Sequence, residues 1–197
     1  VNGTLIIDNA GTPALTFVSR FISPKLMINS GGVFTNNSAN ATAVTIANFY
    51  VYPGGTYNHN AVGSTAAGVV NDFPGSTLRS FGNTSNVVIT KWANGSTTII
   101  NLPASGSPGW GNLTINVATL AASWNQSGSL TNVQGNLNII ATGGSVIGVP
   151  NEFRLTGGTA TTLNILGNLN ISGGGFVGNT GSASPLINIT GDLNLTG

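Results

Sequence analysis

The fold is decided by the stretch Gly167–Gly174, which reads Gly-Asn-Leu-Asn-Ile-Ser-Gly-Gly. The chain repeats it with small variations at Gly111–Asn116, Gly135–Ile139 and Gly191–Gly197. Self-similarity of this kind is the sequence signature of repeat architectures. We therefore expect one structural unit, used several times, to determine the architecture.

The unit has a length that can be read from its leucines. The step from Leu113 to Leu137 equals the step from Leu169 to Leu193, and the step between Leu137 and Leu169 is longer by one short insertion. One unit of about 24 residues thus recurs, within the range usual for repeat proteins. Looser copies precede these, at 26–34 and 46–57, and in the second of them Phe49 and Val51 take the places of the leucine and isoleucine.

The apolar runs of the chain are short, rich in β-branched residues and interrupted by glycine, and they alternate with a period close to two. This pattern predicts strands and excludes amphipathic helices. A parallel β-helix, or β-solenoid, of irregular coils follows, with Leu169 and Ile171 facing inward and Asn168, Asn170 and Ser172 outward. An antiparallel β-sandwich remains as the alternative, since strands spaced at 8–12 residues suit it too.

A second motif lies between the leucine anchors. Trp124 begins Trp-Asn-Gln-Ser-Gly, and Phe153, in the following unit, begins Phe-Arg-Leu-Thr-Gly. The spacing predicts that each aromatic residue starts a strand on a different face of its coil from the leucine strand. Glu152 and Arg154 are expected to form a local pair on one face of the Phe153 strand.

Charged residues make up only 5% of the chain, against roughly a quarter in a typical domain. Stacked coils would place equivalent side chains about 4.8 Å apart. Two like charges at that distance repel by about 1 kcal/mol even in water. Asn, Thr and Ser avoid this repulsion and can form hydrogen-bonded ladders. The composition is therefore typical of stacked β-strands.

The whole chain, residues 1–197, is interpreted as a single β-solenoid segment of a longer protein, because it lacks an initiator Met and stops as a repeat ends. Roughly eight coils at about 4.8 Å each would form a rod near 40 Å long. Between Asn58 and Asn86 the pattern loosens, which indicates either an irregular insertion or degenerate coils.

Several partners are excluded by composition. The net charge is +1, and no basic cluster that could bind nucleic acid forms among Arg20, Lys25, Arg79, Lys91 and Arg154. No apolar run reaches the roughly 18 residues of a membrane-spanning helix. Without cysteine, and without repeated acidic positions or a phosphate-binding loop, we expect no metal and no cofactor.

Few residues could perform chemistry. The carboxylates are Asp8, Asp72, Glu152 and Asp192, and the single imidazole is His59. Carbohydrate-active solenoids group carboxylates with a basic residue for acid–base catalysis. Here only His59, Asp72 and Arg79, in the irregular stretch, could form such a group. Their spacing matches no recognised motif, and a role as polar loop residues explains them better. The sequence therefore predicts a protein that is not an enzyme.

A cluster of tyrosines offers a binding surface instead. Tyr50, Tyr52 and Tyr57 surround Pro53-Gly54-Gly55, and the first two alternate with the apolar Phe49 and Val51, which places them on the outer face. Aromatic rings of this kind stack on sugars, so a carbohydrate-binding strip is one interpretation. Packing of the tyrosines against a neighbouring loop is the other.

The repeats at Gly135, Gly167 and Gly191, with the Phe153-Arg154-Leu155-Thr156-Gly157-Gly158-Thr159 motif, resemble the β-solenoid repeat regions of large secreted surface proteins of Bacteroidota. The resemblance covers residues 110–197 closely and residues 1–57 loosely. It implies export by the type IX secretion system and a role as an adhesin or another cell-surface component.

These observations together predict a non-enzymatic extracellular segment, a stiff repeat stalk that presents other domains or loops. A carbohydrate-binding or carbohydrate-active β-helix is the alternative, with candidate ligand-binding residues Tyr50, Tyr52, Tyr57, His59, Asp72 and Arg79. The expected partners are surface glycans or other proteins, which include the export machinery if the chain is a passenger bound to it.

Overall fold

The computed structural model describes residues 4–7, 14–17, 21–37, 44–61, 73–92, 101–120, 122–146 and 149–196. Among these residues there is no helix, so the prediction of an all-β chain is confirmed for the part described. It follows that the described part contains no helix long and apolar enough to cross a membrane.

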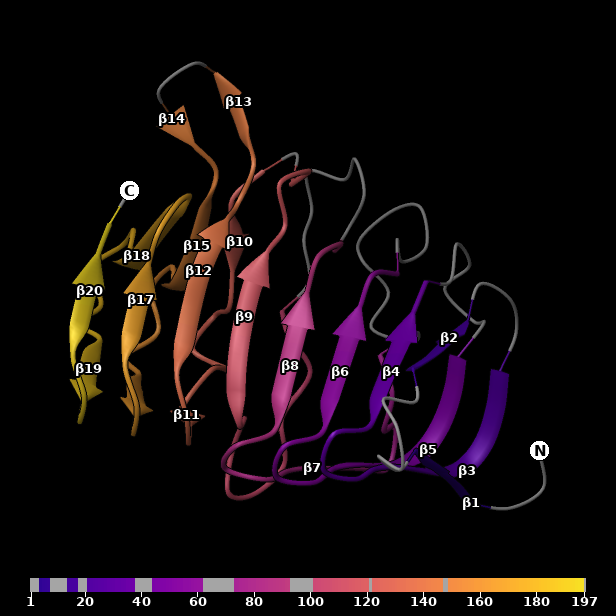
Figure 1. Ribbon diagram of the computed structural model, residues 1–197. Coiled ribbons are helices and arrows are strands. Elements are labelled where there is room, and N and C mark those ends of the chain that lie inside the picture. The colour runs from indigo at the N-terminus through magenta and orange to yellow at the C-terminus, as the bar shows by residue number, and fades with distance from the viewer. Residues whose placement is uncertain are drawn as a thin grey trace.

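The largest sheet has eight strands, in the order β2-β4-β6-β8-β9-β12-β17-β20. All neighbouring strands in it are parallel, and it extends along the whole molecule (Figure 1). Its strands are β2 (Ala14–Phe17), β4 (Val33–Asn36), β6 (Thr56–His59), β8 (Asn86–Ile89), β9 (Asn112–Asn116), β12 (Leu137–Ala141), β17 (Leu169–Ile171) and β20 (Leu193–Leu195).

Three smaller parallel sheets accompany it. A four-stranded sheet, β1-β3-β5-β7, lies in the N-terminal half, and two three-stranded sheets, β10-β15-β18 and β11-β16-β19, lie in the C-terminal half. Their strands are β1 (Thr4–Ile7), β3 (Phe21–Ile28), β5 (Val44–Val51), β7 (Leu78–Phe81), β10 (Trp124–Asn125), β11 (Asn132–Val133), β15 (Glu152–Thr156), β16 (Thr162–Ile165), β18 (Gly175–Asn179) and β19 (Leu186–Ile189).

Most consecutive strands of the largest sheet are joined through strands of the smaller sheets: β3 lies between β2 and β4 in the chain, and β15 and β16 lie between β12 and β17. Among the described strands, only β13 (Gly144–Val146) and β14 (Val149–Pro150) pair antiparallel, and they project from one edge of the molecule (Figure 1). The alternative of an antiparallel β-sandwich therefore does not fit these sheets.

The register confirms the repeat. Leu113 pairs with Leu137, Leu137 with Leu169, and Leu169 with Leu193, so the leucine anchors of the sequence lie opposite one another in adjacent strands. Trp124 likewise pairs with Phe153 in a different sheet, as its spacing predicted. The unit read from the sequence is thus the unit of strand pairing.

The core is formed by alternate side chains: in a strand such as β9, every second side chain points inward while its neighbours point outward. In the largest sheet Leu113 and Leu137 are fully buried and Leu169 is 3% exposed, while Ile171 packs against the core from a partly buried position. In the looser copy, Phe49 and Val51 are buried as predicted. Each buried side chain of this size contributes roughly 1.5–3 kcal/mol to stability.

The predicted asparagine ladders are also present. Asn170 Nδ2 donates to Asn138 Oδ1 at 2.7 Å, and the Asn168 backbone N–H donates to Asn136 Oδ1 at 2.8 Å. The second bond brings the Asn136 side chain against the next strand, where a Cβ on Gly167 would lie 2.4 Å from Asn136 Oδ1. Glycine at this place in the repeat is therefore required by a close approach.

The stretch from Asn58 to Asn86 contains strand β7. Its residue Arg79 pairs with Phe49 of β5, so this part of the stretch continues the four-stranded sheet. Residues 62–72 lie outside the described part of the chain, and with them Asp72.

Candidate functional site

Strand β6 places Tyr57 and His59 in the interior. The strand alternates half-buried and buried residues, and these two side chains are 0% and 1% exposed. Tyr57 lies in register between Phe34 and Val87 in the same sheet. A tyrosine in this register position takes the place of an apolar core residue, so it is not available to a ligand at the surface.

Tyr57 and His59 are joined to each other. The Tyr57 hydroxyl and His59 Nδ1 share a hydrogen bond of 2.8 Å. The bond replaces hydrogen bonds to water that both groups lose on burial. Burial lowers the pKa of His59 from 6.5 to about 3. The imidazole is consequently neutral at physiological pH.

Aromatic rings enclose this pair. The His59 ring lies 5.2 Å from the rings of both Phe73 and Trp92, and the Tyr57 ring meets Phe49 edge-on at 5.0 Å. Phe73 and Trp92 come from two later segments of the chain. The edge-to-face contact between Tyr57 and Phe49 adds about 0.5–1.5 kcal/mol to the burial term. The pair is therefore part of an aromatic core.

Arg79 of β7 binds main-chain carbonyl groups. Its Nε donates to the Pro74 carbonyl at 2.7 Å and its Nη1 to the Ala104 carbonyl at 3.4 Å, while the guanidinium carbon lies 5.7 Å from the Phe73 ring centre. Partial burial lowers the pKa of Arg79, an effect that Tyr57 partly offsets. These contacts explain Arg79 as a residue that fixes the loops beside β7.

Of the candidate acid–base group His59, Asp72 and Arg79, the structure therefore describes two members. Both contact the Phe73 ring, His59 from inside the core and Arg79 alongside its carbonyl partners. His59 is buried and neutral, and Arg79 is hydrogen-bonded to main-chain carbonyl groups. Among the described residues, neither forms a catalytic pair with a carboxylate. In that part of the chain no group of three or more His, Cys, Asp or Glu side chains could hold a metal ion.

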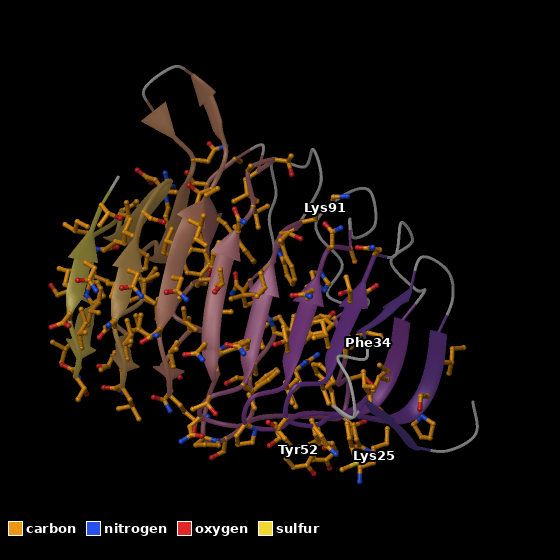
Figure 2. All side chains as sticks on the ribbon, in the orientation of Figure 1. Lys25, Phe34, Tyr52 and Lys91 are labelled. Carbon is orange, nitrogen blue, oxygen red and sulfur yellow. The ribbon has the colours of Figure 1, made fainter. Side chains whose placement is uncertain are left out.

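Tyr50 and Tyr52 have a different environment. Tyr50 lies on the outer side of β5 and Tyr52 directly follows that strand. Tyr52 is 39% exposed, and the two ring centres are 6.3 Å apart with planes inclined by only 13°. Lys25 of β3 places its Nζ 5.0 Å from the centre of the Tyr50 ring. Figure 2 shows Lys25 and Tyr52 protruding from the same face. We call these three residues the tyrosine surface.

The tyrosine surface lies on a sheet without acidic side chains, since strands β1, β3, β5 and β7 contain no Asp or Glu. Sequence reasoning found the two tyrosines from their alternation with Phe49 and Val51. It missed Lys25, because the pairing of β3 with β5 that brings the lysine to Tyr50 joins distant parts of the sequence and leaves no local signal.

The expected local pair on β15 is confirmed, since Arg154 Nε donates to Glu152 Oε2 at 2.6 Å. Both side chains are about one third exposed. An exposed pair of this kind typically adds less than about 1 kcal/mol to stability. It has the properties of a surface ion pair within one strand.

Comparison with known proteins finds no matching family model, no similar curated protein and no similar solved structure. The class of the chain is therefore defined by its own structure. In its described part it is all-β, with four parallel sheets and one antiparallel strand pair, uncharged polar ladders on its outer faces and a stacked pair of outward-facing tyrosines.

Proposed function

We propose that this chain is a β-solenoid segment of a secreted cell-surface protein and that it works as a stiff, non-enzymatic spacer, presenting other domains or loops in the manner of an adhesin stalk. The observation that carries the proposal is the largest sheet, whose eight parallel strands follow one another in sequence order. A coil that returns to the same sheet after each unit produces this order.

Stiffness is supported by the way the coils contact one another. The register partners Leu113, Leu137, Leu169 and Leu193, which we call the leucine column, supply apolar packing from coil to coil. A ladder beside this column joins Thr114, Asn138, Asn170 and Asn194 through side-chain hydrogen bonds of 2.7–3.1 Å. Each coil thus contacts the next through both burial and hydrogen bonds. A bend between two coils would have to break both kinds of contact at once.

The extracellular location and export by the type IX system rest on the resemblance of the repeats to secreted surface proteins. The charge-poor composition agrees with a structural role, because stacked coils leave few positions for the converging charged groups that catalysis needs. An uncharged surface of Asn, Thr and Ser also suits a spacer, because it does not attract charged molecules away from the domains that the spacer presents.

A distance measurement tests the spacer. Thr35 and Asn194 occupy the same register column, six strand pairings apart in the largest sheet. Because the chain contains no cysteine, Thr35→Cys and Asn194→Cys can be labelled with nitroxides without other changes. A stiff stack gives one narrow distance distribution centred near 30 Å, six steps of about 4.8 Å. A broad distribution would reject the spacer.

The second candidate function is glycan binding at the tyrosine surface. What favours it is the pair of nearly parallel, outward-facing rings of Tyr50 and Tyr52, with Lys25 beside them. The rings could stack on the apolar face of a sugar. A catalytic form of this function would need His59 at the surface, and its burial argues against that form.

A further inference from the structure

Exposure changes abruptly along the leucine column at the C-terminal end of the stack. Leu137 is fully buried and Leu169 is 3% exposed, yet Leu193, their register partner in β20, is 55% exposed. Leu195, which pairs with Ile171, is 68% exposed, and Leu186 at the start of β19 is 55% exposed. Side chains that are core residues in one strand are thus surface residues in the last.

The same face has three free strand edges. β18, β19 and β20 each stand last in their sheets. In the preceding strands the leucine N–H always bonds forward: Leu137 N–H donates to the Asn168 carbonyl and Leu169 N–H to the Asp192 carbonyl, both at 2.9 Å. The N–H of Leu193 occupies the equivalent position on the free edge of β20.

The side-chain ladders give this face a polarity. Asn136 Oδ1 accepts from the N–H of Asn168, and Asn168 Oδ1 accepts from the N–H of Asp192, each at 2.8 Å. In each pair the earlier residue accepts and the later one donates. Asp192 follows in this column, so its carboxylate stands where an acceptor for the next N–H is required.

Two further ladders end with the same polarity. Asn194 Nδ2 donates backward to Asn170 Oδ1 and Asn188 Nδ2 donates backward to Asn164 Oδ1, at 2.8 and 2.9 Å. The amide oxygens of Asn188 and Asn194 are then the groups left to accept from a further strand. Two copies of this face, related by a two-fold axis, would bring two surfaces rich in side-chain acceptors together, which disfavours symmetric self-association.

Close packing further restricts what fits. A Cβ on Gly191 would lie 2.1 Å from Asn168 Oδ1, and a Cβ on Gly167 would lie 2.4 Å from Asn136 Oδ1. The residue that meets the acceptor side chain of the preceding strand must therefore be glycine. A segment placed on Asp192 would meet the same requirement.

From these observations we propose that the face formed by β18, β19 and β20 is a docking surface for one further parallel coil of the repeat, with the pattern Gly-polar-Leu-Asn-Leu. Its glycine packs on Asp192, its Asn amide donates to Asn194, and its leucines cover Leu193 and Leu195. The contact continues the coil-to-coil interface already present between β17 and β20. This inference rests on the proposed solenoid, and it specifies which sequence can bind to the end of the solenoid formed by β18, β19 and β20.

An extended chain tests the docking surface. A second copy of residues 174–197 is joined after Gly197, which places the copied leucine at the same interval beyond Leu193 that separates Leu193 from Leu169. Docking predicts that backbone hydrogen exchange at Leu193, followed by NMR, slows by at least about tenfold, because its N–H gains a partner. In the matched control, the appended glycine that corresponds to Gly191 is replaced by valine, and the slowing is lost.

Exchange at Leu193 that is equally fast in the original, extended and control chains would overturn the inference. So would light scattering that shows the original chain to be a dimer that Leu195→Asn dissociates, because a second copy would then be the occupant. The nitroxide distance between Thr35→Cys and Asn194→Cys separates the two proposals. A narrow distance with an undocked extension rejects only the docking surface, whereas a broad distance rejects the spacer as well.

Discussion

Leu137 and Leu169 lie opposite each other in adjacent parallel strands, although the interval between them is longer than the intervals on either side of it in the leucine column. The longer interval contains β13 and β14, the antiparallel pair that projects from the stack. At its base the Asn151 N–H donates to the Gly143 carbonyl at 3.1 Å. The extra residues thus leave and rejoin the unit at nearly the same place, so the register of the leucine column is preserved.

Removal of this projection should leave the stack intact. Replacing residues 144–150 by two glycines shortens a loop whose ends are already joined, and loop-closure entropy changes by less than about 1 kcal/mol. We expect the free energy of unfolding, measured with urea, to change by no more than about 1 kcal/mol. A loss of cooperative unfolding would mean that the projection holds the units together.

The leucine column should contribute far more to stability than the polar position beside it. Leu169→Asn removes a buried side chain and buries an amide in its place, so a loss of about 3 kcal/mol or more is expected. Asn168→Ser removes one side-chain acceptor and should cost about 1 kcal/mol. Both are measured by urea unfolding. Equal losses would contradict the inward assignment of Leu169.

Two glycines provide a matched test of the close approach between units. In Gly167→Ala the new Cβ would meet Asn136 Oδ1 at 2.4 Å and the Gly135 carbonyl at 2.7 Å, and a destabilisation of about 1–3 kcal/mol is expected. At Gly158 nothing lies within 4 Å of the corresponding Cβ, so Gly158→Ala should stay within about 0.5 kcal/mol. Thermal unfolding of the two variants distinguishes them, and a larger loss at Gly158 would refute the packing described.

Burial of His59 predicts a dependence of stability on pH. The folded pKa is about 3, whereas histidine in an unfolded chain titrates near 6.5. Between these values the unfolded state binds more protons, so this contribution to stability is complete above pH 6.5 and is lost as the pH falls. The slope approaches 1.4 kcal/mol per pH unit, or roughly 2 kcal/mol between pH 6.5 and 5.

Urea unfolding across that range measures the effect, and His59→Phe should remove most of it. Because His59 is the single histidine of the chain, its imidazole signals can also be followed directly by NMR. They should not shift between pH 7.5 and 5 in the folded protein. A titration midpoint near 6.5 would show that the ring is hydrated.

Glycan binding at the tyrosine surface can be tested without disturbing the core. If the rings form a platform, Tyr52→Ala should weaken the binding of a neutral hexasaccharide such as cellohexaose roughly five- to twelvefold, since one aromatic contact is worth about 1–1.5 kcal/mol. The melting temperature should stay unchanged because Tyr52 is exposed. Calorimetry supplies the affinities, and Thr114→Ala on the largest sheet is the control. Absence of binding to the original chain would dismiss this function.

The sequence predicts the C-terminal half of the fold better than the N-terminal half, for a physical reason. Leu113, Leu137, Leu169 and Leu193 stand in the same motif, so their alignment can be read from the sequence alone. In the other half Phe34, Tyr57 and Val87 share one column with nothing in common but their burial. Strand alternation fixes which residues share a face, and only the neighbouring strands fix which face is inside.

The candidate site illustrates the same point. Tyr57 and His59 alternate with Thr56 and Asn58, and either pair could face solvent on local grounds. Phe73 and Trp92, which come from later segments, decide the matter by enclosing His59. Tyr50 and Tyr52 could be placed correctly because the Phe49 and Val51 between them are unmistakably apolar.

Force spectroscopy on the full chain, pulled from its two ends, tests the central claim most directly. Coils that contact only their neighbours should unfold one after another, each releasing about 24 residues, or roughly 80 Å of extended chain. The projecting unit between Leu137 and Leu169 should give a longer step. Unfolding of the whole chain in a single event, without intermediate steps, would contradict the stack of coils.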